Sequence, residues 1–433
     1  MIQKRNWKAI PRHLITSQDL ARIEQALVLE NPTWRKTMQL AYSTKGIPRW
    51  LKLWGEVNGN IMVPREFGNS KFPGTSHYLD RPVEWPTTSW APRLHQKEPL
   101  AKLMEAKEGV LVLPCGFGKS IITLFFLEFL GQRALVLAPT KTVVKQWVTY
   151  FDEVFGGDGE ARIATSKNWK AAKHLTVASY QQVALHPLPK EFHEQFGVVV
   201  YDEVDTANAV QLSKALPKFN CLRVGLTATK EREDKMDVLS DLHIGKVVYK
   251  STKMDASVLP SIYVKDSGLH LPDGPPPVRM ITINSLSGQK QEVVMDLVRK
   301  AAVKNRKIFV LCERIEQAEN YYEAAMDEKL SCSLAHSKIK EGLRDYSKQI
   351  IFATNLLGRG FNLEELDTII ITGLFSYSGR EFRQVLGRGQ RLMKGKKKVI
   401  VVIVQDRGPM LRRKLDKVLR AAKELYTDVT YVR

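Results

Sequence analysis

A short apolar run, a glycine loop and a second apolar run of helix length constrain this chain most. Val110–Leu113 is typical of a buried strand, and Pro114–Gly118 of a tight loop. Glycines at 116 and 118 would let backbone N–H groups point inward, and the following helix N-terminus adds positive charge. The stretch predicts a phosphate cradle: Lys119 would reach the β/γ-phosphates and the Ser120 hydroxyl would hold Mg²⁺. The strict pattern has glycine at 113, where this chain has leucine.

Size and charge narrow the class of protein. A chain of 433 residues predicts about two or three domains, each with its own core. A net charge of +20 indicates a polyanionic partner, nucleic acid first and an anionic membrane surface second. We expect no membrane span, because no apolar stretch approaches the required ~20 residues, and no secretory signal at the N-terminus. The cysteines at 115, 221, 312 and 332 lie far apart, which favours reduced thiols over a zinc site or disulfides.

The apolar pattern predicts an α/β protein with two tandem parallel-sheet domains and a small α+β module before them. The first 90 residues hold six of the eight tryptophans, and we expect a DNA-recognition module over residues 1–88. The alternative is that most of these tryptophans form the core of that module. Strand-like runs alternate with helical ones over 89–250 and again over 289–433, while 251–288 breaks the pattern as an interdomain connection.

Acidic and basic residues complete the predicted chemistry. Val198 to Tyr201 is strand-like and ends in Asp202-Glu203, so Asp202 would bind Mg²⁺ through water and Glu203 would orient and deprotonate the attacking water. In the second domain, Arg388 and Arg391 are three residues apart and would serve as arginine fingers. Two acids after a strand, or arginines in a basic turn, are common on solvated surfaces, so each signal depends on the others.

These motifs, in this order, resemble the superfamily 2 helicases over residues 92–405. Gln96 matches the adenine-reading position of the Q motif, Leu111–Ser120 motif I, Leu135–Thr140 with Gln146-Trp147 motif Ia, and Asp202–Asp205 motif II. The later motifs match Thr227–Thr229, Phe352–Thr354 with Gly360–Asn362, and Gln384–Arg391. Gly225-Leu-Thr-Ala-Thr and Arg232-Glu-Asp234 are similar to the XPB branch, and the compact size to phage helicases of the UvsW type.

The resemblance implies two RecA-like domains, ATP and Mg²⁺ as cofactors, and roles for particular residues. The nucleotide would be bound by Gln96, Gly116, Gly118, Lys119, Ser120, Gly360 and Asn362. Nucleic acid would contact Pro139, Thr140, Ser179, Arg232 and Thr354, while Thr227, Thr229 and Gln384 would couple the two sites. Asp205 stands where XPB-like chains have histidine, and Asn362 where many relatives have aspartate.

The resulting hypothesis is an ATP-dependent DNA helicase or translocase that acts in replication, recombination or repair. The phage-type features narrow its expected substrate to branched DNA, such as forks and Holliday junctions. We expect single-stranded and branched DNA, and recombination or replication proteins, as partners of a monomer in the cytoplasm, or the host cytoplasm if the gene is phage-encoded. An RNA helicase, a duplex translocase that does not unwind, and a non-enzymatic basic scaffold are the alternatives.

Overall fold

The computed structural model describes most of the chain and divides it into two compact units. The described residues are 7–39, 42–72, 78–114, 116–232, 234–251, 260–270, 278–340, 343–354, 366–374, 377, 381–383, 385–386, 399–423 and 429–432. The first unit comprises residues 1–113 and 118–251, and the second residues 252–433 together with the short loop 114–117. Within the described residues, no helix has both the length and the apolar character that a bilayer crossing requires.

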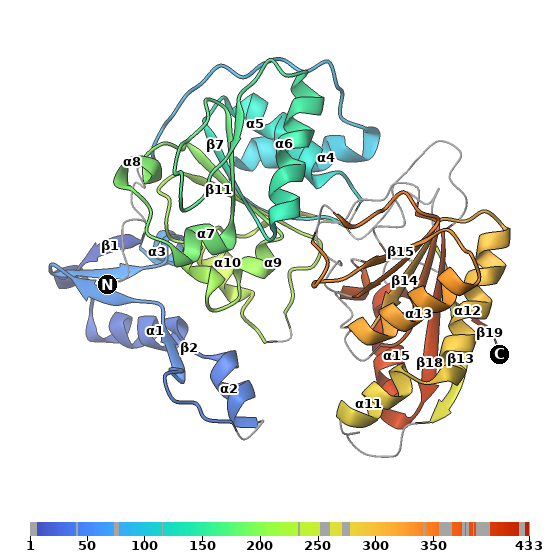
Figure 1. The fold of residues 1–433 in the computed structure, drawn as a ribbon. Coiled ribbons are helices and arrows are strands. Elements are labelled where there is room, and N and C mark those ends of the chain that lie inside the picture. Colours follow the sequence, from blue (N-terminus) through green and yellow to red (C-terminus); the bar gives the residue numbers. More distant parts are fainter. Residues whose placement is uncertain are drawn as a thin grey trace. The chain divides into compact units, whose positions relative to one another are not determined.

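The first unit begins with a small α+β module (Figure 1). A three-stranded antiparallel sheet has the order β1-β5-β4, and β2 pairs with β3 in a separate ribbon. Asn58 and Gly59 form the turn that joins β4 to β5, and both have positive φ, 49° and 72°. The module's elements are β1 Lys8–Pro11, the 3-10 turn Arg12–Leu14, α1 Ser17–Leu27, β2 Val28–Glu30, α2 Pro32–Gln39, β3 Trp50–Lys52, β4 Gly55–Val57, β5 Asn60–Val63 and α3 Arg65–Lys71.

This module shares its core with the domain that follows. Ile23 and Leu27 of α1 pack with Ile61 and Val63 of β5, and the same cluster includes Leu242 from the domain after the module. The segment 78–92, rich in turn formers, is also packed: the Trp85 ring lies edge-on to Phe151 and Phe155, and its indole N–H donates to the Gln132 carbonyl. The module is therefore built into the first unit.

Arg65 is the polar anchor of this junction. Its side chain is 4% exposed, donates to the Cys221 carbonyl and to Glu108, both at 2.8 Å, and lies over the Tyr78 ring. Burial raises the pKa of Glu108 by more than the Arg65 charge lowers it. An ion pair of this kind contributes little net stability while intact, but removing one partner leaves the other buried and uncompensated.

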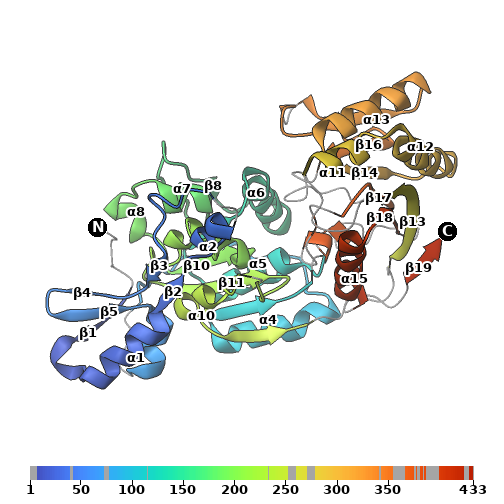
Figure 2. The same cartoon turned by 90° about the horizontal axis from the view of Figure 1, so that it is seen from below.

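The first RecA-like domain is a seven-stranded parallel sheet in the order β12-β6-β11-β10-β7-β9-β8. Its five central strands are apolar on both faces, as the strand-like runs over 89–250 predict. The short strands β8 and β12 were not anticipated. The elements are α4 Leu94–Ala106, β6 Gly109–Val112, α5 Lys119–Leu130, β7 Ala134–Ala138, α6 Lys141–Phe155, β8 Ala161–Ile163, β9 Leu175–Ser179, α7 Tyr180–Leu185, α8 Lys190–His193, β10 Val198–Asp202, α9 Val204–Ala207, the 3-10 turn Leu212–Ala215, β11 Leu222–Thr227, α10 Val238–His243 and β12 Val247–Lys250. Figure 2 shows the same elements from below.

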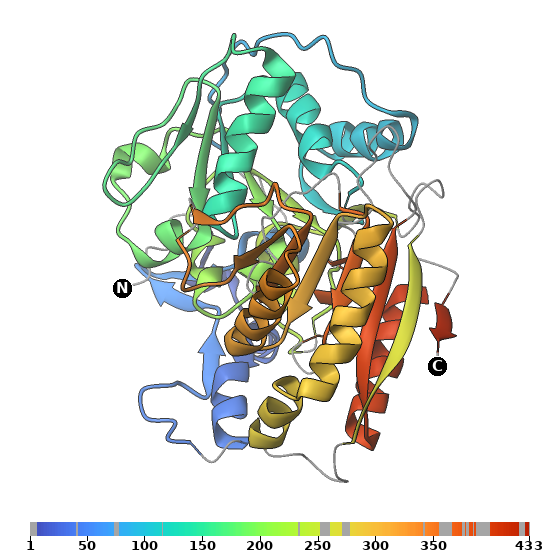
Figure 3. The same ribbon diagram turned by 45° about the vertical axis from the view of Figure 1, so that its right-hand side comes forward.

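The second unit is a second seven-stranded sheet, in the order β15-β16-β14-β17-β18-β13-β19 (Figure 3). Strand β13 lies within 251–288, where the sequence suggests only a connection, because Lys265, Asp266 and Ser267 interrupt its apolar pattern. It pairs in parallel with β18 and β19. The elements are β13 Ser261–His270, α11 Val278–Ser285, α12 Gly288–Val303, β14 Ile308–Cys312, α13 Ile315–Asp327, β15 Cys332–Ala335, β16 Ile350–Thr354, β17 Thr368–Ile371, β18 Ile400–Arg407, α15 Pro409–Lys423 and β19 Val429–Val432.

Helices cover both faces of this second sheet, as the sequence predicts. Phe309 and Leu311 of β14 pack with Leu415 and Leu419 of α15 on one face. Ile308 and Val310 of the same strand pack with residues of α12 and α13 on the other. Alternate side chains of one strand thus enter separate cores, which is the pattern of a doubly covered parallel sheet.

We predict that Arg65→Ala destabilises the first unit by about 3–5 kcal/mol, because Glu108, only 25% exposed, then lacks its cation and the buried Cys221 carbonyl lacks its donor. Urea unfolding followed by circular dichroism measures this. Arg22→Ala is the matched control, since Arg22 is 68% exposed and only 3.7 Å from Asp19, and it should cost less than about 1 kcal/mol. Equal loss in the two variants would contradict the anchoring role of Arg65.

Candidate nucleotide and nucleic-acid site

The predicted phosphate cradle has the expected strand, loop and helix. Gly116 and Gly118 have φ of 84° and 88°, a region that glycine adopts without strain, and α5 starts at Lys119. Lys119 Nζ donates to the Leu113 carbonyl at 3.0 Å. A Cβ on Gly118 would lie 2.2 Å from Nε2 of Gln96, so the backbone at 118 and the predicted adenine-reading glutamine are in close approach. Ser120 lies in the first turn of α5.

The two acids of motif II lie at the carboxyl end of β10. Asp202 is 7% exposed; its Oδ2 accepts the indole N–H of Trp147 at 2.8 Å, and its Oδ1 accepts the backbone N–H of Glu203 at 2.9 Å. Burial, and then the Glu203 carboxylate, raise the pKa of Asp202 to about 6, although Trp147 and Lys119 act in the opposite direction.

Glu203 is held in a strained backbone conformation. Its φ is 47° and ψ 55°, in the left-handed region that non-glycine residues seldom adopt, and its Oε2 is buried without a hydrogen-bond partner. A buried carboxylate oxygen with an unfilled acceptor position fits an attacking water. The cradle, the buried Asp202 carboxylate and this open acceptor together fit a triphosphate with its Mg²⁺.

A hydrogen-bond chain leads from motif II to motif III. The Thr227 hydroxyl donates to Asp205 Oδ1 at 2.8 Å and accepts the Thr229 N–H at 3.1 Å. Asp205 therefore makes the contact to motif III through its own carboxylate at the position where XPB-like chains have histidine. The assignment of Thr227 and Thr229 to coupling stays a prediction, and the hydrogen bond from Thr227 to Asp205 is consistent with it.

Arg232, predicted to contact nucleic acid, is engaged inside the first unit. Its guanidinium pairs with both carboxylate oxygens of Asp234 and donates to the backbone carbonyl of Asp205. The Arg232–Asp234 pair thus braces the carbonyl of a motif II residue. In this arrangement Arg232 reaches DNA only if that pair opens, so its predicted contact remains a prediction.

The remaining strand-contact residues of the first domain meet at one edge of its sheet. Pro139-Thr140 follows β7, and Ser179 ends the neighbouring strand β9, with Ala138 and Ser179 in register. Gln181 Nε2 donates to the Pro139 carbonyl at 3.4 Å, which links the two loops. The Thr140 and Ser179 hydroxyls accept backbone N–H groups at the starts of α6 and α7, so each hydroxyl proton remains able to donate to a phosphate oxygen.

Thr354 lies at the corresponding carboxyl edge of the second sheet. It ends β16, is 5% exposed, and its Oγ1 is buried without a hydrogen-bond partner. Arg314, which follows the adjacent strand β14, has a buried Nε that is also unpartnered. Two unused donors at neighbouring strand ends suit an anionic oxygen. Arg314 has no motif signature in the sequence and could not be found from it.

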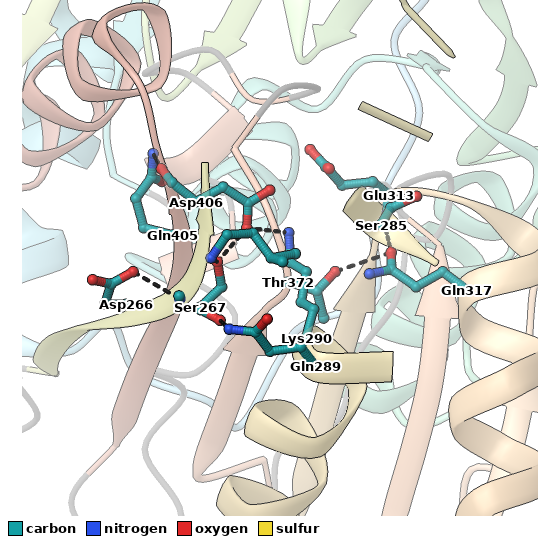
Figure 4. Close-up of polar contacts among 12 residues, drawn as sticks. Asp266, Ser267, Ser285, Gln289, Lys290, Glu313, Gln317, Thr372, Gln405 and Asp406 are labelled. Carbon is teal, nitrogen blue, oxygen red and sulfur yellow. Dashed lines mark hydrogen bonds and ion pairs between the residues drawn. The ribbon is translucent and has the colours of Figure 1, made fainter. Parts of the chain in front are cut away.

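A buried polar cluster supports this edge (Figure 4). Lys290, 1% exposed near the start of α12, pairs with Asp406 at the end of β18 at 2.9 Å. The Ser267 hydroxyl donates to the same carboxylate oxygen at 2.6 Å. This cluster joins α12 to β13 and β18. This cluster could not be predicted from the sequence, because a lysine and an aspartate more than a hundred positions apart form no local pattern.

Several predicted site residues lie outside the described residues. They are Gly360, Asn362, Gln384, Arg388 and Arg391. Their assignments to nucleotide binding, coupling and catalysis stay predictions.

Trp147 lies in the stretch that resembles motif Ia, but the resemblance assigns no role to it. We predict that Trp147→Phe weakens magnesium-dependent nucleotide binding about 10- to 100-fold, because a charge-assisted hydrogen bond to Asp202 is lost. Titration of a fluorescent ATP analogue against Mg²⁺ measures the effect. Trp169→Phe is the matched control, since the described contacts of Trp169 include the Phe192 ring and neither acid. An unchanged magnesium dependence in Trp147→Phe would refute the positioning role.

Comparison with known proteins agrees with this geometry. Residues 89–232 match the family described as Type III restriction enzyme, res subunit, and residues 289–393 match the Helicase conserved C-terminal domain. The protein named "Probable helicase D10" of Escherichia phage T5 is 24% identical over 311 residues, 69% of this chain and 68% of that protein. The protein named DNA 3'-5' translocase XPB2 of Sulfurisphaera tokodaii is 28% identical over 167 residues, 37% of this chain and 36% of its own length.

The fold has counterparts among solved structures. S. cerevisiae Dbp5, in a structure with RNA and ADP BeF3, superposes with a TM-score of 0.58 at 16% identity, over 79% of this chain and 90% of that one. At this identity the match establishes the fold alone. With both helicase domains matched in order and the phosphate loop and acids placed as one site, the chain belongs to the superfamily 2 helicases of the XPB-like type and is an ATP-dependent helicase.

Proposed function

We propose that this protein is an ATP-dependent DNA helicase or translocase that acts on branched DNA, such as forks and Holliday junctions, in replication, recombination or repair. The motor part is supported by the Asp202-Glu203 pair at the end of β10 and by the hydrogen bond from Thr227 to Asp205, two residues after Glu203. Motifs II and III thus lie at the ends of the neighbouring strands β10 and β11. DNA as the substrate is supported by the names of the relatives, and branched DNA by the cationic module at 7–72.

In this proposal each residue of the first domain has a defined task. Lys119 and the N–H groups of the loop bind the β/γ-phosphates, and Ser120 and Asp202 hold Mg²⁺. The metal supplies charge neutralisation on the phosphates. Glu203 orients the attacking water and accepts its proton through the buried Oε2. Gly360, Asn362, Arg388 and Arg391 would complete the site from the second domain.

Nucleic acid would be held mainly through phosphates. Thr140 and Ser179 would donate hydroxyl protons to one stretch of backbone, and Thr354 and Arg314 to another. Such binding tolerates any sequence and weakens steeply with salt. An RNA helicase uses the same phosphate contacts and remains the alternative to be tested, as does a duplex translocase that does not separate strands.

We predict that Glu203→Gln lowers ATP turnover about 10²- to 10⁴-fold while nucleotide and DNA binding persist, because only the proton acceptor is lost. Steady-state hydrolysis and filter binding measure the two properties. Glu105→Gln is the control, since Glu105 is 74% exposed on α4, and it should behave as the parent. Normal turnover in Glu203→Gln would remove Glu203 from the reaction.

The substrate is tested by ATP hydrolysis with matched single strands, blunt duplexes, forks and four-way junctions, in DNA and in RNA. We expect stimulation by DNA forks or junctions to exceed stimulation by blunt duplex, because strand contacts and the cationic module act together only at a branch. Preference for RNA would support the RNA helicase, and an equal response to blunt duplex would support the duplex translocase.

A further inference from the structure

The β2–β3 ribbon of the N-terminal module has one anchored side and one free side. Leu29 and Leu51 pack against the core of the first RecA-like domain. Because side chains alternate along a strand, Trp50 and Lys52 lie on the opposite side, and both are exposed, Trp50 by 52%. Figure 2 shows β2, β3 and α2 in dark blue. A large indole ring is thus presented to solvent from a strand that is fixed on the motor domain.

Arg49 is arranged against this ring. Its guanidinium carbon lies 5.0 Å from the centre of the Trp50 ring and 4.9 Å from that of Trp34 on α2. Lys52 Nζ lies 3.7 Å from the centre of the Trp54 ring. Cation–π contacts of this kind restrain both the cation and the ring. We define the Trp50 surface as Trp34, Arg49, Trp50 and Lys52.

A buried residue fixes the backbone beneath the Trp50 surface. Asn31, 2% exposed, donates its side-chain N–H to the Pro48 carbonyl at 2.9 Å and its backbone N–H to the Arg49 carbonyl at 2.8 Å. Its Oδ1 accepts the Thr33 N–H at the start of α2. The segment before Trp50 is therefore tied to α2, and little ordering entropy remains to be lost when a ligand binds.

The charge around this surface is predominantly positive. Residues 31–55 contain five cationic side chains, at 35, 36, 45, 49 and 52, and no Asp or Glu. Glu30, the register partner of Trp50, pairs with Arg35. Lys36, Lys45, Arg49 and Lys52 therefore leave the surface cationic, which suits a polyanion.

The other tryptophans of the first 90 residues have different surroundings. Trp85 is 7% exposed in the aromatic cluster with Phe151, and Trp7 lies edge-on to His243. The Trp54 indole N–H is buried. Trp90 is 46% exposed, but among the described contacts no cation lies over its ring. The combination of an exposed ring with restrained cations belongs to Trp50.

We propose that the Trp50 surface binds single-stranded DNA, with an unpaired base stacked on Trp50 and neighbouring phosphates paired with Arg49 and Lys52. This inference rests on the proposed function and names the part of the DNA that the module holds. Bases inside a duplex have no free face for stacking, so the surface selects a strand that has already separated. Because the ribbon is anchored on the first motor domain, a strand held here is fixed relative to the nucleotide site of that domain.

Binding of a fluorescently labelled oligothymidylate, with a blunt duplex for comparison, tests the proposal in the full-length chain. Trp50→Ala should weaken binding to the single strand about 5- to 100-fold and binding to the duplex far less, because one stacking contact is lost. Arg49→Gln should weaken single-strand binding and lower the salt dependence by about one phosphate contact. Trp90→Ala is the control and should bind as the parent does.

Folding and function are separated by two further measurements. Arg49→Gln alters an exposed side chain, so its melting temperature should equal that of the parent and its binding defect is readable even if Trp50→Ala folds poorly. An affinity for the oligothymidylate within twofold of the parent's in both variants would overturn the proposal. So would a loss of affinity that is seen only with a single-stranded RNA ligand and not with the oligothymidylate. If DNA stimulates ATP hydrolysis while both variants bind single-stranded DNA normally, the proposal for the Trp50 surface is wrong and the proposed function stands. If no nucleic acid stimulates ATP hydrolysis by the parent protein, the proposed function is wrong.

Discussion

The buried carboxylate of Asp202 is the group around which the first domain is arranged. An ionised side chain at the end of an apolar strand is costly, and burial raises the pKa of Asp202 to about 6. The Trp147 indole, the Glu203 N–H and the Lys119 charge each favour its ionised form. These groups come from α6, the end of β10 and the start of α5. An ionised Asp202 carboxylate thus requires the phosphate loop, motif Ia and motif II to be correctly positioned around it.

A second constraint links this site to the N-terminal module. Arg65 enters the first domain and bonds the Cys221 carbonyl beside β11, the strand that carries Thr227. Leu242 of α10 completes the core of the module. Module and domain share buried residues, so deletion of 1–88 would expose apolar and charged groups together. Point changes on the module surface are therefore the cleaner probe of what it recognises.

Much of the fold could be predicted from the sequence, because buried parallel strands are apolar on both faces, as Val198–Tyr201 shows. The phosphate loop and the acids were predictable because their chemistry fixes residue types at short spacing. Strand β13 was missed, since Lys265, Asp266 and Ser267 break its pattern. The pairings Lys290–Asp406 and Trp147–Asp202 could not be predicted from the sequence, because they join residues that only the folded sheets bring together.

The central claim is that ATP turnover in this site moves DNA strands. Its most direct test is single-turnover strand separation on a DNA fork labelled with a donor and an acceptor dye, started by ATP and repeated with a non-hydrolysable analogue and with Lys119→Ala. The account predicts strand separation with ATP alone, and none with the analogue or the variant. Separation that proceeds equally in all three reactions would contradict it, because DNA binding without hydrolysis would then suffice.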